Sequence, residues 1–273
     1  MKKVLILIFI LILTLFMVFC TQKSTSIDIA GSTTVLPIVQ AIAEIFMDLN
    51  PEINVSVRGG GSSIGIKSAI DETIDIGNSS REIKDNEIEI LQEKNKELKK
   101  IAIAQDAITM IVHKSNKIKN LSIVQLKKIY SGKITNWKEL GGNNKNIIVI
   151  SRDVSSGSFE VFYEKALKNS KLLTNCMMLA SNNAVAGTVS YTPGAIGYVG
   201  RGYANQKHNI LSLENISPTT KNVLNKTYPL SRKLFIFTTE QNKKTVDMFI
   251  NFVLSEKGQE IVEKQGYVKI VNN

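Results

Sequence analysis

Hydrophobic and polar positions alternate with two different spacings along most of this chain. Residues 36–49 carry apolar side chains every three or four positions and stop just before Pro51, which predicts a helix. Residues 26–30 and 147–152 are short apolar runs of the kind that forms strands. The alternation continues with predicted strands at 54–58 and 74–77, predicted helices at 63–70, 122–130 and 159–167, and further segments at 184–191, 196–199, 234–238 and 246–254. Strands alternating with helices predict an α/β fold.

One apolar stretch is longer than a typical strand. Residues 101–113 are almost continuously hydrophobic and are broken only near Gln105 and Asp106. This pattern predicts either two strands or one strand that crosses between two parts of the fold.

The N-terminus has the pattern of an export signal. Lys2 and Lys3 precede an apolar run over residues 4–19, which ends at Cys20. This run is shorter than the roughly 20 residues that span a bilayer, although an uncleaved anchor helix remains an alternative. A cysteine directly after the run resembles the bacterial lipoprotein signal, in which that cysteine is acylated. We therefore expect a signal peptide over residues 1–19 and a lipid-anchored tether over residues 20–25, followed by about 250 residues of folded protein.

The formal net charge of +10 is compatible with several classes of anionic partner. Nucleic acid, anionic lipid headgroups and a small anionic ligand would each suit a basic chain. The lysines are dispersed over segments that are predicted to be exposed, and the sequence has no zinc-finger spacing, RNA-recognition motif or aromatic-basic stripe. We therefore expect no nucleic-acid partner.

Four short stretches combine glycine with small hydroxyl residues where an extended segment is predicted to turn into a helix. They are Gly31-Ser32-Thr33-Thr34, Gly59-Gly60-Gly61-Ser62-Ser63, Gly77-Asn78-Ser79-Ser80-Arg81 and Arg152-Asp153-Val154-Ser155-Ser156-Gly157-Ser158. A helix start leaves backbone N–H groups unpaired and carries partial positive charge, so it attracts anions. Four such stretches predict a shared oxyanion site.

Helix capping alone is the alternative role for each hydroxyl group. We favour capping for Ser79 and Ser155, and ligand contact for Ser62, Ser156 and Ser158.

A serine hydrolase is the alternative from another functional class. Gly61-Ser62-Ser63-Ile64-Gly65 fits the nucleophile elbow, with Ser63 as the nucleophile. The chain has only two histidines, His113 and His208, and no histidine and acid pairing is apparent around the motif. The same histidines and Cys176 form no plausible ligand set for a metal, so we expect neither a metal nor a cofactor.

Several stretches, taken in order, resemble the substrate-binding proteins of bacterial phosphate ABC importers. They are Gly31-Ser-Thr-Thr-Val-Leu-Pro37, Gly59-Gly-Gly-Ser-Ser-Ile-Gly-Ile-Lys67, Asp75-Ile-Gly-Asn-Ser-Ser-Arg81, Tyr130-Ser-Gly-Lys-Ile-Thr-Asn-Trp-Lys-Glu-Leu140, Ser190-Tyr-Thr-Pro-Gly-Ala-Ile-Gly-Tyr198, Tyr228-Pro-Leu-Ser-Arg232 and Phe252-Val-Leu-Ser-Glu-Lys-Gly-Gln259. The resemblance covers nearly the whole chain after the predicted signal peptide.

The resemblance implies a two-lobed periplasmic binding protein of type II, with two α/β domains joined by two crossover strands and a ligand cleft between them. Lobe I would comprise residues 26–105 and 230–273, and lobe II residues 106–229. Such a protein is a non-enzymatic monomer that binds inorganic phosphate and delivers it to the permease subunits of the importer. A lipid on Cys20 would hold it at the periplasmic side of the cytoplasmic membrane.

The resemblance also implies which residues bind the anion. From lobe I they are the Thr33 side chain, the Thr34 backbone N–H, Ser62 and Ser80, and from lobe II they are Arg152, Ser156, Gly157 and Ser158. Independently of the family, a tetrahedral oxyanion needs short donors from several directions, and one arginine can add a charge-assisted contact.

Two positions depart from the family's best-known pattern. Ser80 stands where some members have an aspartate that accepts the phosphate proton. Val154 stands where the arginine usually has its aspartate partner, while Asp153 lies one position earlier. Sulfate and molybdate therefore remain alternative ligands. Arg81 can either pair with a carboxylate at the rim of the cleft or be solvated.

Overall fold

The computed structural model describes residues 25–239 and 243–270. The predicted signal peptide, Cys20 and the tether up to residue 24 lie outside these residues. In the part of the chain that is described, no helix is both long enough and apolar enough to cross a bilayer.

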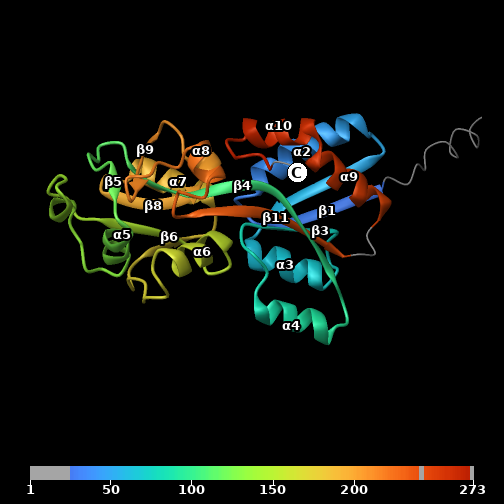
Figure 1. Ribbon diagram of the computed structural model, residues 1–273, viewed down its shortest axis with the longest axis horizontal. Coiled ribbons are helices and arrows are strands. Elements are labelled where there is room, and N and C mark those ends of the chain that lie inside the picture. Colours follow the sequence, from blue (N-terminus) through green and yellow to red (C-terminus); the bar gives the residue numbers. More distant parts are fainter. Residues whose placement is uncertain (1–24, 240–242, 271–273) are drawn as a thin grey trace, which may run out of the picture.

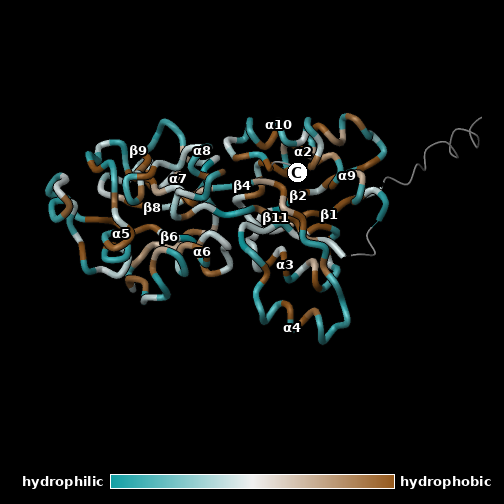
Figure 2. The backbone as a smooth tube through the Cα atoms, viewed as in Figure 1, coloured by the Kyte–Doolittle hydropathy of each residue, from teal (hydrophilic) through white to brown (hydrophobic). Residues whose placement is uncertain are grey.

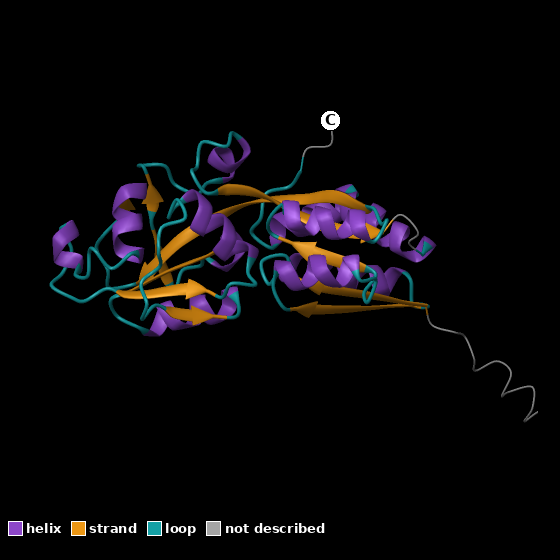
Figure 3. Ribbon diagram, turned by 90° about the horizontal axis from the view of Figure 1, so that it is seen from below, coloured by secondary structure: helices purple, strands orange, loops and turns teal. Residues whose placement is uncertain are grey.

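Two α/β lobes lie side by side, and two strands connect them (Figure 1). Strand β4 (Leu98–His113) carries the chain from the first lobe to the second, and β11 (Ser231–Thr239) brings it back. The first part of β4 pairs antiparallel with β11, and its last residues pair antiparallel with β8 in the second lobe. The long apolar stretch is therefore one crossing strand, and Figure 3 shows long strands passing from one lobe into the other.

Lobe I contains the parallel strands β1, β2 and β3, with β1 in the middle. Helices α2, α9 and α10 cover one face of this sheet, α3 lies against the other face, and α4 lies beyond α3 (Figure 1). The elements are β1 (Thr25–Gly31), α2 (Leu36–Leu49), β2 (Ile53–Gly59), α3 (Ser62–Ile70), β3 (Ile76–Ser79), α4 (Asp85–Glu93), α9 (Lys244–Leu254) and α10 (Glu256–Lys264).

Lobe II is built around β6, which pairs in parallel with β7 on one side and β8 on the other. The elements are β5 (Asn120–Leu121), α5 (Ile123–Tyr130), η1 (Trp137–Leu140), β6 (Ile148–Arg152), α6 (Gly157–Lys165), β7 (Met177–Leu179), α7 (Asn182–Tyr191), β8 (Ala195–Gly200), η2 (Arg201–Tyr203), β9 (His208–Ile210), β10 (Ser212–Leu213) and α8 (Thr220–Leu224). The order of strands across both lobes is β2-β1-β3-β11-β4-β8-β6-β7, with β9 also paired to β4.

Several helices begin and end where the sequence predicts them. Helix α2 has the predicted bounds, because its buried residues recur at helical spacing and Pro51 follows its end. Helix α6 begins two residues earlier than predicted, because the Ser156 side chain accepts hydrogen bonds from the first free N–H groups. Helix α4 was not predicted, and Leu91 is its only buried residue, so its apolar pattern is weak.

Apolar segments occur in both lobes (Figure 2), and the buried ones form separate clusters. In lobe I, Phe46 packs edge-on against Phe249. In lobe II, Phe162 stacks on Tyr198 with ring centroids 4.1 Å apart. Val268 packs into the lobe II core, whereas its neighbour Tyr267 packs into the lobe I core, so the segment after α10 contacts both lobes.

The single tryptophan of the chain is a core residue of lobe II. Trp137 is buried, and its indole Nε1–H donates to the carbonyl of Gly194 at 2.8 Å. A buried indole N–H needs such an acceptor, so this contact fixes the ring within the lobe.

Candidate functional site

The four hydroxyl-rich stretches lie at the carboxyl ends of four strands. Strands β1, β2 and β3 end at Gly31, Gly59 and Ser79, and β6 of the other lobe ends at Arg152. Carboxyl ends of parallel strands meet at one edge of a sheet, which is where ligands bind in open α/β folds. The topology therefore gathers the four stretches where the two lobes face each other.

Side chains from these stretches meet across the interface between the lobes. The hydroxyl oxygens of Thr34 in lobe I and Ser158 in lobe II are 3.1 Å apart. The Ser62 hydroxyl accepts the backbone N–H of Ser80 at 3.0 Å, and the two serine hydroxyl oxygens are 3.3 Å apart. The structure therefore brings the predicted residues of both lobes into one buried region.

Gly157, the first residue of α6, lies against the serine pair of lobe I. A Cβ atom at this position would be 2.4 Å from the Ser62 hydroxyl oxygen and 2.9 Å from that of Ser80. Real Cβ atoms do not approach other atoms so closely, so only glycine lets the lobes come together here.

Ser156 caps helix α6 and can still bind a ligand. Its hydroxyl oxygen accepts the backbone N–H groups of Ser158 and Phe159. A hydroxyl group has two acceptor positions and one proton, so both acceptor positions are used and the proton is left to donate. Capping and ligand contact are thus compatible roles for Ser156.

Arg152 is a buried cation that is only partly neutralised. Its Nε donates to the carbonyl of Leu179 at 3.1 Å, and its NH2 donates to the carbonyl of Ala180 at 2.9 Å. The nearest carboxylate belongs to the half-buried Asp153, whose oxygen is 3.6 Å from NH2. Burial lowers the pKa of Arg152, and the charge of Asp153 opposes this effect. Since the guanidinium has five N–H donors, others remain for an anion, which would complete its neutralisation.

A second arginine, Arg232, lies close to residues 31–34 of lobe I, which we call the threonine turn. Its Nε and NH2 donate to one carboxylate oxygen of Asp106 at 2.9 and 2.8 Å, so the ion pair joins the two crossover strands. The same guanidinium donates to the carbonyl of Ser80 at 3.1 Å and reaches the Thr34 hydroxyl at 3.4 Å. Burial raises the pKa of Asp106, and Arg232 opposes that shift. The pair therefore links the two crossover strands, β4 and β11, to Thr34 and Ser80 of the predicted site.

Arg81 is neutralised by carboxylates from both lobes. It lies 2.7 Å from an oxygen of Glu87 in lobe I and 2.6 Å from an oxygen of Glu160 on α6 of lobe II. Lys84 and Ser63 also contact Glu160, at 2.8 and 3.1 Å. Of the two roles considered for Arg81, the structure shows pairing with carboxylates. We call these five residues the Arg81 network.

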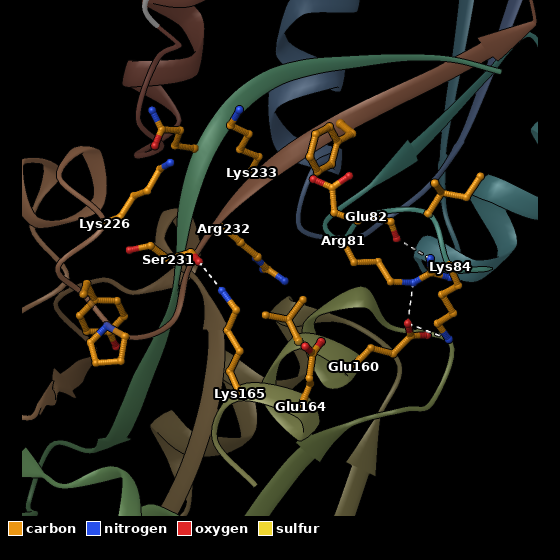
Figure 4. Close-up of a pocket in the computed structure, with 16 residues that line it drawn as sticks. Arg81, Glu82, Lys84, Glu160, Glu164, Lys165, Lys226, Ser231, Arg232 and Lys233 are labelled. Atoms are coloured by element: carbon orange, nitrogen blue, oxygen red, sulfur yellow. Dashed lines mark hydrogen bonds and ion pairs between the residues drawn. The ribbon is translucent and has the colours of Figure 1, made fainter. Parts of the chain in front are cut away.

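A cavity of about 560 Å³ lies beside this network, between α6 and the crossover strands (Figure 4). Lys165 of α6 points across it and donates to the Ser231 carbonyl on β11 at 3.0 Å. None of the eight predicted ligand residues lines this cavity, so it is distinct from the region where they meet.

Other hydroxyl groups of the four stretches bond locally. The Ser79 hydroxyl donates to the Arg81 carbonyl at 2.8 Å, and the Ser155 hydroxyl contacts the Asp153 carboxylate. Neither serine caps a helix, because Ser156 is the N-cap of α6 and Lys84 is the N-cap of α4. The capping prediction for Ser79 and Ser155 is therefore wrong, and both hydroxyl groups instead stabilise the loops that follow β3 and β6. The backbone N–H of Thr34 donates to the Ser32 hydroxyl at 3.2 Å, so its predicted contact with the anion stays a prediction.

The nucleophile-elbow motif does not assemble a catalytic triad. Ser63 bonds with Arg81 and Glu160, whereas His113 bonds with Ser115 and His208 with Ser190. Within the described residues, Ser63 therefore has no histidine partner that could remove its proton.

Comparison with known proteins identifies the family. A family model described as the PBP superfamily domain matches residues 21–257. The phosphate-binding protein PstS of Borreliella burgdorferi is 35% identical over 99% of this chain and 99% of its own length. PstS of Bacillus subtilis is 33% identical, over 92% of this chain and 83% of its own. The chain belongs to the PstS family of the PBP superfamily.

Solved structures agree with this family. A Clostridium perfringens structure, described as a phosphate ABC transporter substrate-binding protein with bound phosphate, is 37% identical. Its TM-score is 0.85, and the match covers 90% of this chain and all of that one. The predicted two-lobed fold of periplasmic binding proteins is therefore confirmed. The ligand roles of the eight residues and the residue boundaries of the lobes stay predictions.

Sequence reasoning missed several residues that contact the predicted ligand residues or their neighbours, among them Asn182, Arg232 and Glu160. Asn182 contacts the hydroxyl groups of Thr33 and Thr34, Arg232 contacts Thr34, and Glu160 contacts Ser63 next to Ser62. Of these three, only Arg232 left a signal in the sequence, because it ends one of the stretches that carry the family resemblance.

Proposed function

We propose that this protein binds inorganic phosphate outside the cytoplasmic membrane and delivers it to the permease subunits of an ABC importer. One observation carries the proposal: hydroxyl groups and helix starts from both lobes converge, together with the partly neutralised Arg152, in one buried region. The relatives named above are phosphate-binding proteins, and one related structure contains phosphate. The proposed role is binding and transfer, without catalysis.

The chemistry of the site suits a dehydrated tetrahedral anion. Each hydrogen bond to a charged ligand contributes roughly 1.5 to 3 kcal/mol. Several such bonds suffice, after desolvation costs, for micromolar binding, which requires about 8 kcal/mol. An anion bound to both lobes stabilises the closed arrangement, because it makes all of its contacts only there.

We propose that the Ser62 and Ser80 pair accommodates the phosphate proton. Either hydroxyl of the pair can be the donor. When the Ser80 hydroxyl donates to Ser62, its own oxygen is free to accept the proton of phosphate. Sulfate has no proton to offer near neutral pH, so this arrangement favours phosphate. The preference is smaller than a carboxylate would give, because a hydroxyl can turn and donate to sulfate.

Equilibrium binding of radiolabelled phosphate to the purified protein tests the function. We expect stoichiometric binding with no chemical change in phosphate, and weaker competition by sulfate and molybdate. Tighter binding of sulfate or molybdate would assign the protein to that anion instead. Failure to bind any of the three would contradict the proposed function.

We also propose that acylation of Cys20 anchors the protein at the periplasmic side of the cytoplasmic membrane. The sequence of the leader supports this, and a single acyl chain anchors weakly, so more than one is expected. Cys20→Ser should move the protein from the detergent phase to the aqueous phase in a partition experiment. Unchanged membrane retention would favour an uncleaved helix as the anchor.

A further inference from the structure

Asn182 is a fully buried polar residue that joins the two lobes at the predicted anion site. It is the first residue of α7 in lobe II, and its side chain reaches the threonine turn of lobe I. Its Nδ2 donates to the hydroxyl oxygens of Thr33 and Thr34, at 3.1 and 3.0 Å.

The orientation of the Asn182 amide follows from its third contact. The backbone N–H of Gly200 points at Oδ1 from 2.9 Å. An N–H group can only donate, so the oxygen must face Gly200 and the NH2 group must face the threonines. Each of the two amide hydrogens then has one threonine acceptor.

These contacts decide what the Thr34 hydroxyl can do. Its oxygen receives the Asn182 amide at 3.0 Å and the Arg232 guanidinium at 3.4 Å. Neither group can accept a hydrogen bond, so both acceptor positions of the oxygen are used. The Thr34 proton is therefore left for another acceptor. The Ser158 oxygen lies 3.1 Å away, and an anion bound between the lobes would be a further acceptor.

Thr33 is constrained in the same way. Its hydroxyl oxygen lies 3.1 Å from the Asn182 amide nitrogen and 3.4 Å from the Asn182 backbone nitrogen. Both nitrogens are donors, so the Thr33 hydroxyl proton is also left for another acceptor. One asparagine thus makes two hydroxyl groups of the opposite lobe into donors.

We propose that Asn182 is a positioning residue of the anion site, which holds the protons of the Thr33 and Thr34 hydroxyls toward the bound anion when the lobes are together. This inference rests on the proposed function. It adds that the threonine side of the site accepts only unprotonated oxygens, because its hydroxyls cannot turn to accept. The protonated oxygen of phosphate must then face another part of the site. The Ser62 and Ser80 pair can accept its proton, because either hydroxyl of the pair can be the donor.

A double-mutant cycle on phosphate affinity tests the inference. Asn182→Ala and Thr34→Val should each weaken phosphate binding by roughly 10- to 100-fold, as expected for hydrogen bonds to a charged ligand. If Asn182 acts partly through the Thr34 hydroxyl, the loss in the double variant should be smaller than the product of the two single losses, while the part that acts through Thr33 remains. Losses that multiply in the double variant would overturn the inference, because Asn182 would then act independently of the Thr34 hydroxyl.

Asn182→Asp provides a second test that preserves the shape of the side chain. The carboxylate keeps an acceptor for Gly200 but accepts the threonine protons instead of directing them, so phosphate binding should be weaker than in Asn182→Ala. Binding equal to that of the unmodified protein would overturn the inference. If Asn182→Ala does not fold, the cycle is run with the uncharged variant Asn182→Ser and Thr34→Val.

Phosphate binding by the unmodified protein shows which of the two proposals fails. If it does not bind phosphate, the proposed function fails before any variant is measured, and the cycle is run with whichever of sulfate and molybdate it binds. If it binds phosphate but the losses multiply, only the role of Asn182 fails.

Discussion

Arg81 in lobe I and Arg152 in lobe II occupy comparable places but differ in how their charges are balanced. Each lies at the carboxyl end of a parallel strand, and their side chains are only 4% and 1% exposed. Arg81 faces the carboxylates of Glu87 and Glu160, whereas Arg152 bonds to backbone carbonyls and has a carboxylate only at 3.6 Å. Burial and position alone therefore do not distinguish an arginine with donors left for an anion from one that is paired with carboxylates of both lobes. The balance of nearby charge does.

Truncation of Arg152 should have the largest effect. Removing one partner of a desolvated charge pair costs roughly 2 to 5 kcal/mol, so Arg152→Ala should weaken phosphate binding from about thirtyfold to several thousandfold. The ligand-free protein loses two hydrogen bonds to carbonyls and the 3.6 Å pair with Asp153, but it also loses a buried charge that is only partly neutralised. Its midpoint of thermal unfolding should therefore fall by a few degrees at most, as about 1 kcal/mol would produce. Calorimetry with and without phosphate measures both effects. Retained affinity would remove Arg152 from the site and break the comparison.

A methyl group at Gly157 should have the second largest effect on phosphate affinity. Gly157 is the first residue of α6 and lies against Ser62 and Ser80 of lobe I. In Gly157→Ala the new Cβ would clash with Ser62 and Ser80, so the lobes cannot approach as closely. Overpacking typically costs about 1 to 3 kcal/mol, which corresponds to roughly 5- to 150-fold in phosphate affinity. Gly187→Ala is the matched control, because a Cβ there meets nothing within 4 Å. Equal affinities of the two variants would show that close approach at Gly157 is not required.

Neutralising Glu160 tests the role assigned to Arg81. Glu160→Gln removes a charge that lies across the interface from Arg81 and Lys84, so the closed arrangement should be less stable. We expect phosphate affinity to fall by roughly 3- to 10-fold, since a partly exposed ion pair contributes about 1 kcal/mol. Glu164→Gln, one helical turn further along α6 and outside the Arg81 network, is the control. A rise in affinity would mean that Arg81, once less neutralised, itself binds the anion.

Substitutions at Ser80 should have the smallest effect, and mainly on selectivity. Ser80→Ala removes the proposed acceptor and should lower the ratio of phosphate to sulfate affinity by several-fold, whereas Ser80→Asp should raise it. Competition titrations with sulfate on the three proteins measure this ratio. If Ser80→Ala leaves the ratio untouched, the acceptor lies elsewhere, and a backbone carbonyl or Asp153 is the next candidate.

Local signals in the sequence were sufficient for much of the fold. The helical spacing over residues 36–49 and the apolar run over residues 101–113 correspond to α2 and β4. The hydroxyl-rich stretches could be found because each combines glycine and serine after a predicted strand. Three of them lead into α2, α3 and α6, but the stretch after β3 leads into a loop, because α4 begins only at Asp85. Such signals depend on residues that are close in sequence, so they can be recognised without the tertiary structure.

The missed residues depend on how the two lobes meet. Asn182 lies 149 positions from Thr33, and nothing around it in the sequence indicates that its amide will enter the other lobe's turn. Asp106 was noted only as a break in the apolar run, and its partner Arg232 lies 126 positions away. Long-range partners of this kind are set by packing, which a single sequence does not display.

The burial of Trp137 in the core of lobe II determines what intrinsic fluorescence can report. Its indole is fixed by the Gly194 carbonyl and belongs to the lobe II core, while the predicted ligand contacts lie where the lobes meet. Emission excited at the tryptophan band should therefore change little when phosphate binds, and a phosphate sensor based on this protein needs a dye placed near the cleft. The same emission gives a native optical probe for the unfolding of lobe II, against which circular dichroism of the whole chain can show whether the two lobes melt together.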